Sequence, residues 1–210
     1  MLKILVTDDH AMIRLGLKQV LAKHFPSAVV GEAQSAEEAL EEVRRKTWDL
    51  LVLDISMPGR SGLDVLKDIH LAKPSLPVLI MSMHGEDQFA VRVLKAGAAG
   101  FISKHSAPDE LVSAIQKILG GGKYVSSKVA ERLVLDLGRE TGRPPHELLS
   151  DRELQVMCMF ASGKVNKQVA KELSLSVKTV STYRARLLEK MNMQSNAELT
   201  HYAIKGGLVE

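Results

Sequence analysis

Four charged residues of this 210-residue chain, Asp8, Asp9, Asp54 and Lys104, could do chemistry together, because each follows a short apolar stretch that predicts a buried β-strand. If these strands pack side by side, three carboxylates converge, and crowded carboxylates raise one another's pKa unless a cation is bound. A hard divalent cation relieves the repulsion, and Mg²⁺ fits best because it accepts a few carboxylates and keeps several waters. One carboxylate could then attack phosphorus while the metal and Lys104 neutralise the phosphoryl oxygens.

Ser82 follows another apolar stretch and would add a hydroxyl that donates a hydrogen bond to the phosphoryl group. Taken singly, these residues have plain structural interpretations. Asp8 and Asp9 could belong to a turn, and Lys104 could be a surface lysine. The joint pattern of five polar groups at the ends of four predicted strands favours a phosphoryl-transfer site.

The elements that must position these groups alternate between strands and helices over the first 120 residues. We expect strands at 3–7, 28–33, 50–54, 78–81 and 100–103, and helices at 11–25, 36–46, 63–72, 87–96 and 108–119. Apolar strands that alternate with helices predict an α/β fold, a five-stranded doubly wound parallel sheet covered on both faces. Function gathers at the carboxyl ends of the strands in such sheets, which is where the acids stand.

The last 60 residues show four helical patterns and no strand pattern. We expect helices at 151–161, 166–173, 177–191 and 197–205. A short helix, a three-residue turn ending at the plausible N-cap Ser176, and a longer basic helix predict a helix-turn-helix in a small all-α domain. The predicted domains are therefore 1–120 and 148–210, joined by a linker, 121–147, that contains a helical segment at about 128–137.

Charge and composition limit the functional classes. Residues 150–210 hold nine Lys and Arg against six Asp and Glu, whereas residues 1–122 hold 14 against 15, which weakly indicates a polyanionic partner for the C-terminal part. The single cysteine, Cys158, fits a reducing compartment and lies in an apolar run typical of a buried thiol. No apolar stretch is long enough for a signal peptide or a membrane span, so we expect a cytoplasmic protein without a membrane partner.

Several segments of the first 120 residues resemble the signature of response-regulator receivers. They are Asp8-Asp9-His10, Leu53-Asp54-Ile55-Ser56-Met57-Pro58-Gly59, Ser82, Ala96-Gly97-Ala98-Ala99-Gly100-Phe101 and Ser103-Lys104. The resemblance implies a flavodoxin-like strand order of 2-1-3-4-5. Two departures are that His105 stands where a cis proline often follows the lysine, and that Phe101 lacks a tyrosine hydroxyl and could switch only by packing.

The receiver resemblance also implies roles for individual residues. Asp54 would accept a phosphoryl group from a sensor histidine kinase, with Lys104 and Ser82 assisting. Ser82 and Phe101 would form the switch pair. The implied Mg²⁺ ligands are Asp8 (through water), Asp9, Asp54 and the backbone carbonyl of Ser56.

The C-terminal residues 148–208 resemble the DNA-binding domain of NarL/FixJ-type (LuxR-type) regulators, and within that family Lys178 to Arg184 and Glu198-Leu199-Thr200-His201 are most similar to the GacA/UvrY and BvgA branches. The resemblance rests on Leu149-Ser150-Asp151-Arg152-Glu153-Leu154, Gly163-Lys164-Val165-Asn166-Lys167 and Val177-Lys178-Thr179-Val180-Ser181-Thr182-Tyr183-Arg184. Such proteins read paired half-sites of double-stranded DNA as dimers. We therefore expect a homodimer when phosphorylated, with dimer contacts from Ala197, Leu199 and Tyr202.

The third C-terminal helix has the amphipathic pattern that a major-groove helix needs. At about 100° per residue, Val180, Leu187 and Met191 share one stripe that should face the core, with Tyr183 at its edge. The predicted DNA contacts are Lys164, Asn166, Lys167, Lys178, Thr179, Ser181, Thr182, Arg184, Ala185 and Arg186. Arg184 lies near the core stripe and could reach a phosphate or pair internally; we favour the phosphate.

The sequence thus predicts a transcription regulator rather than an enzyme, whose own chemistry is phosphoryl transfer to Asp54 and slow self-dephosphorylation. One alternative is a regulator that binds DNA regardless of phosphorylation. A more remote one is a Mg²⁺-dependent aspartyl phosphatase, although Asp8 and Asp9 are adjacent where such enzymes have an Asp-x-Asp pair.

Overall fold

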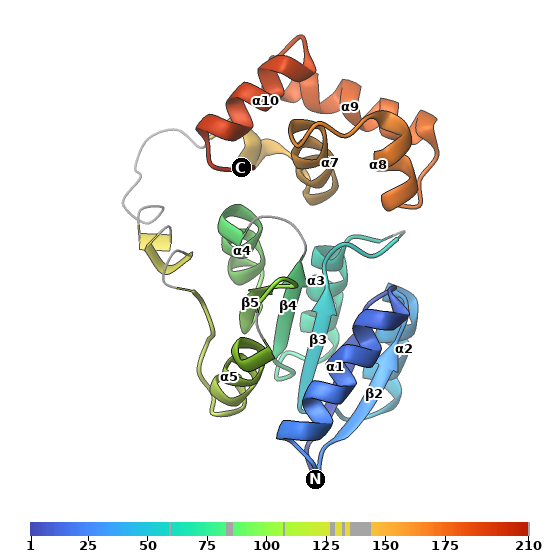
Figure 1. Cartoon of the computed structure of the whole chain (residues 1–210), viewed down its shortest axis with the longest axis vertical. Helices are drawn as coiled ribbons and strands as arrows, with labels where there is room; N and C mark the ends of the chain where they lie inside the picture. Colours follow the sequence, from blue (N-terminus) through green and yellow to red (C-terminus); the bar gives the residue numbers. More distant parts are fainter. Residues whose placement is uncertain are drawn as a thin grey trace. The chain divides into compact units, whose positions relative to one another are not determined.

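The computed structural model describes residues 1–58, 60–82, 86–106, 108–126, 129–131, 133–134 and 144–209, with the backbone alone at 86–89. Contacts between Cα atoms divide the chain into two compact units, Met1–Arg132 and Leu133–Glu210. The first combines a sheet with helices, and the described residues of the second form helices joined by turns, with no strand (Figure 1). None of the described helices is both long and apolar enough to cross a lipid bilayer.

The first unit contains five strands and five helices in strict alternation. The strands are β1 (Lys3–Thr7), β2 (Val29–Ala33), β3 (Leu50–Asp54), β4 (Val78–Ser82) and β5 (Gly100–Ser103), and the helices are α1 (Ala11–His24), α2 (Ala36–Arg45), α3 (Gly62–Ala72), α4 (Glu86–Lys95) and α5 (Pro108–Leu119). All strand pairs are parallel and the order is β2-β1-β3-β4-β5, which confirms the predicted fold.

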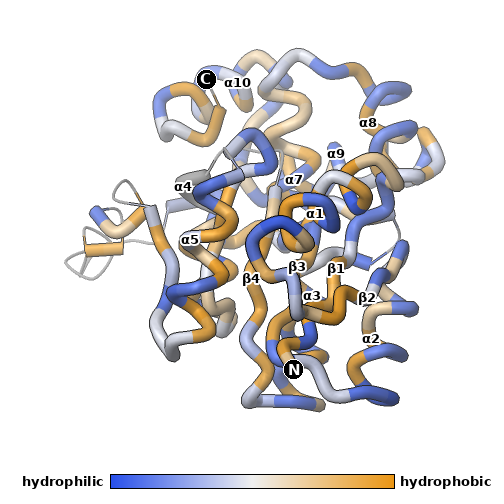
Figure 2. The backbone as a smooth tube through the Cα atoms, turned by 60° about the horizontal axis from the view of Figure 1, so that its bottom comes forward, coloured by the Kyte–Doolittle hydropathy of each residue, from blue (hydrophilic) through white to orange (hydrophobic). Residues whose placement is uncertain are grey.

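The sheet holds together because its central strands are apolar on both faces. Every residue of β3 and β4 is buried, as expected for a parallel sheet covered by helices on both sides. On one face Ile4, Val52 and Met81 pack with residues of α1 and α5, and alternate strand residues face α2 and α3. Figure 2 shows the central strands as largely hydrophobic tube segments.

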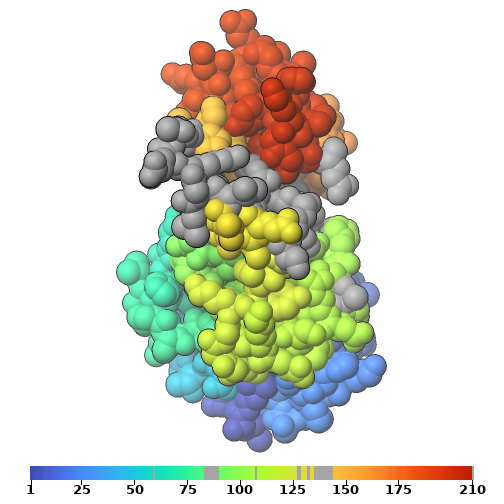
Figure 3. Space-filling model, turned by 90° about the vertical axis from the view of Figure 1, so that its left-hand side faces the viewer, coloured from blue at the N-terminus to red at the C-terminus, as the bar shows by residue number. Residues whose placement is uncertain are grey.

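The chain after α5 remains attached to the sheet beyond the predicted boundary at residue 120. Gly121 turns the chain at a φ of 84°, a conformation that favours glycine. Tyr124 then forms a bridge with Gly100 of β5, and its N–H donates to the Ala99 carbonyl at 2.9 Å. Figure 3 looks onto this side of the first unit, with α5 and the following residues in yellow-green and yellow.

The second unit is built around one buried helix. It comprises the 3-10 turn η1 (Pro145–Leu148), α7 (Asp151–Ala161), α8 (Asn166–Glu172), α9 (Val177–Met191) and α10 (Asn196–Lys205). Helix α7 is buried from Arg152 to Ala161, and α8, α9 and α10 pack around it. This environment includes Cys158, which is buried as predicted.

The linker between the two units was predicted to hold a helical segment at 128–137. Residues 129–131 and 133–134 are helical, and the rest of that segment lies outside the described residues.

The turn between α8 and α9 gives the unit its helix-turn-helix. Helix α8 ends one residue earlier than predicted, and Ser174 takes a left-handed φ of 51°, which reverses the chain. The Ser176 side chain then accepts a hydrogen bond from the Thr179 N–H at 3.0 Å, as the predicted cap of α9. This geometry confirms the predicted small all-α domain.

Candidate functional site

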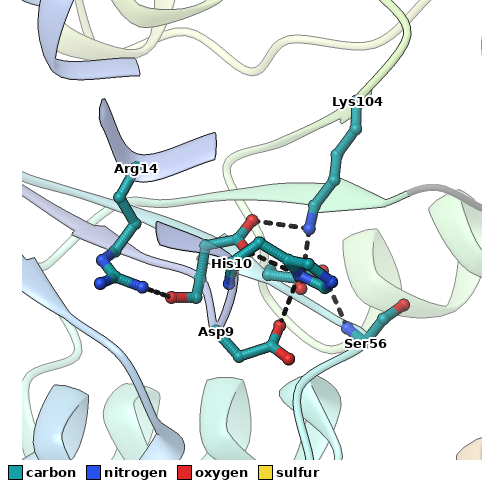
Figure 4. A network of polar contacts seen from close by, with 7 residues as sticks. Asp9, His10, Arg14, Ser56 and Lys104 are labelled. Atoms are coloured by element: carbon teal, nitrogen blue, oxygen red, sulfur yellow. Dashed lines mark hydrogen bonds and ion pairs between the residues drawn. The ribbon is translucent and has the colours of Figure 1, made fainter. Parts of the chain in front are cut away.

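The predicted acidic residues meet at the carboxyl edge of the sheet. Asp54 is the last residue of β3, Asp8 directly follows β1, and Lys104 directly follows β5. Because β1 and β3 are parallel neighbours and pair Thr7 with Leu53, their ends lie side by side. In Figure 4, Lys104 and Asp9 point into the same space from different elements. The topology therefore brings together residues that are nearly 100 positions apart in the chain.

Lys104 bridges two buried carboxylates. Its Nζ lies 2.6 Å from Asp8 Oδ2 and 2.8 Å from Asp54 Oδ2, and each of the three side chains is at most 2% exposed. The Ser56 N–H donates to Asp54 Oδ1 at 2.9 Å. One carboxylate oxygen of Asp54 is thus held by a backbone donor, and the other faces the ammonium.

The donor set fits a hard divalent cation. Ligand atoms of Asp8, Asp9, His10 and Asp54 all lie within 4.8 Å of one another. Asp9 Oδ1 and Asp54 Oδ2 are buried and accept no well-directed hydrogen bond, although His10 and Lys104 approach them as ion-pair partners at 2.9 and 2.8 Å. Three carboxylates therefore face one ammonium, and a divalent cation with oxygen ligands would balance the remaining charge.

The electrostatics of the pocket reflect this crowding. Burial raises the pKa of Asp54, Lys104 opposes that rise, and the nearby Asp8 carboxylate adds to it. Burial by itself would lower the pKa of Lys104, but the Asp54 and Asp8 carboxylates outweigh it and raise this pKa above its usual range. The lysine thus holds its proton more readily than an ordinary lysine, whereas Asp54 holds its charge less readily than an ordinary aspartate.

The predicted switch residues lie on β4 and β5, the paired strands that lead to Lys104. Ser82 ends β4 and is fully buried, and its carbonyl accepts a hydrogen bond from the Lys104 N–H at 2.8 Å. Phe101 is buried on β5, where its N–H donates to the Tyr124 carbonyl at 3.3 Å. No cis peptide bond occurs among the described residues, so the bond from Lys104 to His105 is trans.

Arg14 is a pocket residue that the sequence analysis did not identify. Its Nη1 donates to the backbone carbonyl of Asp8 at 2.7 Å (Figure 4). Because the contact is to a main-chain atom, no pairing of side-chain types signals it in the sequence. His10, in contrast, occupies the N-cap position of α1 without a capping bond from its side chain, and its backbone N–H donates to Asp8 Oδ1 at 2.8 Å.

The second candidate surface is the outer face of α9. Val180, Leu187 and Met191 are buried and Tyr183 is half-buried, as the predicted stripe requires. The opposite face is exposed at Lys178, Ser181, Thr182, Ala185 and Arg186, with Lys167 exposed on α8. This face therefore combines small, polar and cationic side chains, which suits the edges and phosphates of a DNA groove.

Several predicted DNA contacts are already paired within the unit. Lys164 Nζ lies 2.5 Å from Glu172 Oε2, and Asn166 Nδ2 donates to Ser181 Oγ at 2.9 Å, which ties α8 to α9. Arg184 Nε donates to Asn196 Oδ1 at 2.7 Å. For Arg184 the structure thus shows an internal pairing through Nε, and the Nη groups carry further donors that could contact a phosphate.

The predicted dimer contacts on α10 differ in exposure. Ala197 is exposed, whereas Leu199 is fully buried in the core of its own unit and presents no surface to a partner in this single chain. Leu199 follows the helical period of the inner face, which the sequence does not distinguish from a dimer face. Tyr202 is half-buried, and its hydroxyl lies 2.6 Å from Nδ1 of His146 in η1.

Comparisons with known proteins agree with both parts of this description. The profile of the response regulator receiver domain matches residues 4–116, and that of bacterial regulatory proteins of the luxR family matches residues 147–203. The chain is 37% identical over 209 residues to the response regulator UvrY of Escherichia coli (strain K12), covering 99% of this chain and 96% of UvrY. It is 36% identical over 211 residues to the response regulator GacA of Pseudomonas syringae pv. syringae (strain B728a), covering 100% and 99%.

A solved structure extends the likeness to three dimensions. RcsB from Salmonella enterica serovar Typhimurium, bound to promoter P1flhDC in the presence of the phosphomimetic BeF3−, matches with a TM-score of 0.60 and 25% identity, covering 96% of this chain and 97% of RcsB. These likenesses are to transcription regulators rather than to phosphatases. The chain therefore belongs to the two-component response regulators with a LuxR-type DNA-binding domain.

Proposed function

We propose that Asp54 is the phosphoryl acceptor of this regulator and that its phosphorylation by a sensor histidine kinase controls DNA binding through α8 and α9. One observation carries the proposal: a buried carboxylate at the end of β3 shares the Lys104 ammonium with Asp8 at 2.8 and 2.6 Å. Such a group places a carboxylate nucleophile directly beside a fixed cation. That pairing suits phosphoryl transfer rather than passive structure.

The resident cation we propose is Mg²⁺. Asp9, Asp54 and the backbone carbonyl of Ser56 would hold it, with Asp8 acting through water, because these are hard oxygen donors in a pocket that retains negative charge. When bound, the metal would neutralise charge on the phosphoryl oxygens. Nucleophilic attack, pairing with the phosphoryl charge and hydrogen bonding would come from the side chains of Asp54, Lys104 and Ser82.

In the proposed reaction, a carboxylate oxygen of Asp54 attacks phosphorus of a phosphohistidine on the kinase. A P–O bond forms and the P–N bond breaks; its electron pair stays on the imidazole nitrogen, which takes a proton from solvent. Lys104 stays protonated and pairs with the phosphoryl oxygens. In self-dephosphorylation, water attacks phosphorus and the P–O bond to Asp54 breaks, which yields inorganic phosphate and restores the carboxylate.

The new phosphoryl group would then act on the switch residues. The Ser82 hydroxyl would move to donate a hydrogen bond to it, and the buried Phe101 ring would repack to follow. A nearly complete shift between two states requires about 5 kcal/mol of differential stabilisation. The Lys104 ion pair and the hydrogen bond from Ser82 could supply it.

For the output, we propose that the phosphorylated chain dimerises and reads paired half-sites of double-stranded DNA. Side chains of α9 would enter the major groove, and cations near α8 would contact phosphates. The proposed contacts are Lys164, Asn166, Lys167, Lys178, Thr179, Ser181, Thr182, Ala185 and Arg186. Arg184 would join them through its Nη donors while Nε keeps its bond to Asn196. Ala197 and Tyr202 remain the proposed dimer contacts on α10.

The experiment that tests this function selects DNA from a random pool with the full chain, with and without beryllofluoride, and then measures affinity for the selected site. We expect beryllofluoride to tighten binding by the wild type and to have no effect on Asp54→Asn. Asp64→Asn, a substitution at an exposed acid on α3, is the matched control and should respond like the wild type.

Two outcomes would contradict the proposal. A response to beryllofluoride in Asp54→Asn would show that another group accepts the phosphoryl mimic. Equal affinity of the wild type with and without beryllofluoride would favour a regulator that binds DNA regardless of phosphorylation.

A further inference from the structure

Arg14, on the first turn of α1, contacts the loop that carries two of the pocket carboxylates. Its side chain is only 13% exposed, and Nη1 donates to the Asp8 carbonyl oxygen at 2.7 Å. That carbonyl belongs to the peptide unit joining Asp8 to Asp9. Because a peptide unit is planar, a donor that fixes its oxygen also fixes the direction in which the Asp9 backbone leaves it.

The same loop is held at two further points. The Asp8 N–H donates to the Ala33 carbonyl at 3.2 Å, and the His10 N–H donates to Asp8 Oδ1 at 2.8 Å. These bonds fix the amide side of Asp8 and its carboxylate. The bond from Arg14 holds the peptide oxygen between the two aspartates.

Arg14 is itself oriented by an acid on strand β2. Its Nε lies 3.4 Å from Glu32 Oε2 on β2, and Lys18 Nζ lies 2.5 Å from the other oxygen of Glu32. The hydrogen bond from Lys18 lowers the pKa of Glu32, burial opposes this effect, and Arg14 adds to the lowering, so Glu32 is ionised. The planar guanidinium can donate to Glu32 and to the Asp8 carbonyl at once, which a lysine ammonium cannot do in the same geometry.

We propose that Arg14 is a positioning residue for the metal pocket: it holds the Asp8–Asp9 peptide so that the Asp9 carboxylate faces Asp54. This inference rests on the proposed function of the pocket. The direction in which Mg²⁺ affinity changes when Arg14 is removed distinguishes positioning from charge, because a cation next to a cation site by itself weakens metal binding. If Arg14 acted only through charge, removing it would tighten Mg²⁺ binding, whereas a positioning role requires that removal loosen it.

The test measures Mg²⁺ affinity of the full chain by calorimetry for the wild type, Arg14→Met and Lys18→Met. Lys18 is the matched control because it lies on the same helix and pairs with the same glutamate, its Nζ lying 2.5 Å from Glu32 Oε1. We expect Arg14→Met to weaken binding about tenfold or more, as removal of groups that orient metal ligands commonly does. Lys18→Met should stay within about twofold, as expected for a partly exposed charge.

Two further measurements make the result decisive. The backbone amide signals of Asp9 and His10 should shift in Arg14→Met and not in Lys18→Met, which reports on the loop without any metal. Arg14→Lys keeps the charge and the aliphatic stem and should bind Mg²⁺ with an affinity between those of the wild type and Arg14→Met. If Arg14→Met does not fold, the Mg²⁺ affinity of Arg14→Lys tests the positioning role in its place.

Wild-type or tighter Mg²⁺ binding by Arg14→Met or Arg14→Lys would overturn the inference, as would an equal loss in Lys18→Met. Failure of the proposed function looks different. In that case Mg²⁺ binding by the wild type would be absent, or would persist unchanged in Asp9→Asn and Asp54→Asn, and the inference about Arg14 would fall with it.

Discussion

Two lysines in this protein are paired with carboxylates at similar distances but in opposite surroundings. Lys104 lies 2.6 and 2.8 Å from two acids in a pocket where no partner is more than 2% exposed. Lys164, in the DNA-binding unit, lies 2.5 Å from Glu172, with the two side chains 31% and 46% exposed. Contact distance does not separate these pairs, whereas solvent access does, since water weakens the interaction of exposed charges.

The difference shows how each region can work. In the pocket a change of charge meets little screening by water, so the proposed phosphoryl group would act strongly on its neighbours. On the proposed DNA-binding surface the exposed pairs are weak, so a DNA phosphate would replace Glu172 at little cost. The proposed function thus depends on buried charge in the receiver and on exposed charge in the DNA-binding unit.

The largest predicted effect is on the buried pair. Without a divalent cation, Lys104→Met should lower the free energy of unfolding by about 3 kcal/mol, because it leaves two buried carboxylates without their cation. Mg²⁺ should restore much of the loss by binding only the folded state. Urea unfolding with and without Mg²⁺ measures both effects, and Lys164→Met is the exposed control. An equal loss of unfolding free energy in Lys104→Met and Lys164→Met would show that burial does not make the Lys104 pair stronger than the exposed one.

An intermediate effect is expected at Glu153, whose buried carboxylate lies 2.7 Å from the half-exposed Lys190 and also binds Ser150. Burial raises the pKa of Glu153, but the hydrogen bonds from Lys190 and Ser150 outweigh it and leave this pKa below its usual value. Glu153→Gln should therefore lower the free energy of unfolding of the C-terminal unit by about 2 kcal/mol at pH 7, measured by urea unfolding.

Acidification should change the free energy of unfolding in opposite directions through Glu153 in the DNA-binding unit and Asp54 in the pocket, which gives a further comparison of the two regions. The lowered pKa of Glu153 means that its contribution is present above the ordinary value of 4.5 and is lost as pH falls through the folded value. Asp54, with its raised pKa, takes up a proton more readily when folded, so its contribution grows as pH falls through its folded value. Acid unfolding of Glu153→Gln and Asp54→Asn should depart from the wild type in opposite directions.

The smallest predicted effect is at the exposed pair. Glu172→Gln frees Lys164 for phosphate and should tighten DNA binding by about two- to fivefold, the range that an exposed ion pair is worth. The gain should shrink as salt rises, because screening weakens the pair in the wild type. Fluorescence anisotropy at two salt concentrations measures it. Weaker DNA binding by Glu172→Gln would show that the glutamate supports the surface rather than competing for it.

The sequence predicted the sheet and the pocket well because both follow from simple patterns. Apolar strands ending in Asp54 or Lys104 reveal the carboxyl edge, and a parallel order then brings those ends together. Arg14 could not be predicted in this way, because its partner is a carbonyl whose direction depends on the folded loop. Leu199 was assigned to a dimer face because a helical period alone does not show whether an apolar residue faces its own core or a partner.

The most direct test of the central claim is to locate the phosphoryl group on the protein. The full chain is treated with acetyl phosphate and Mg²⁺, reduced with borohydride, which converts an acyl phosphate of aspartate to homoserine, and analysed by peptide mass spectrometry. We predict homoserine at position 54 and none at positions 8 or 9. Homoserine at position 8 or 9 with none at 54, or no conversion while DNA binding still responds to acetyl phosphate, would contradict the account.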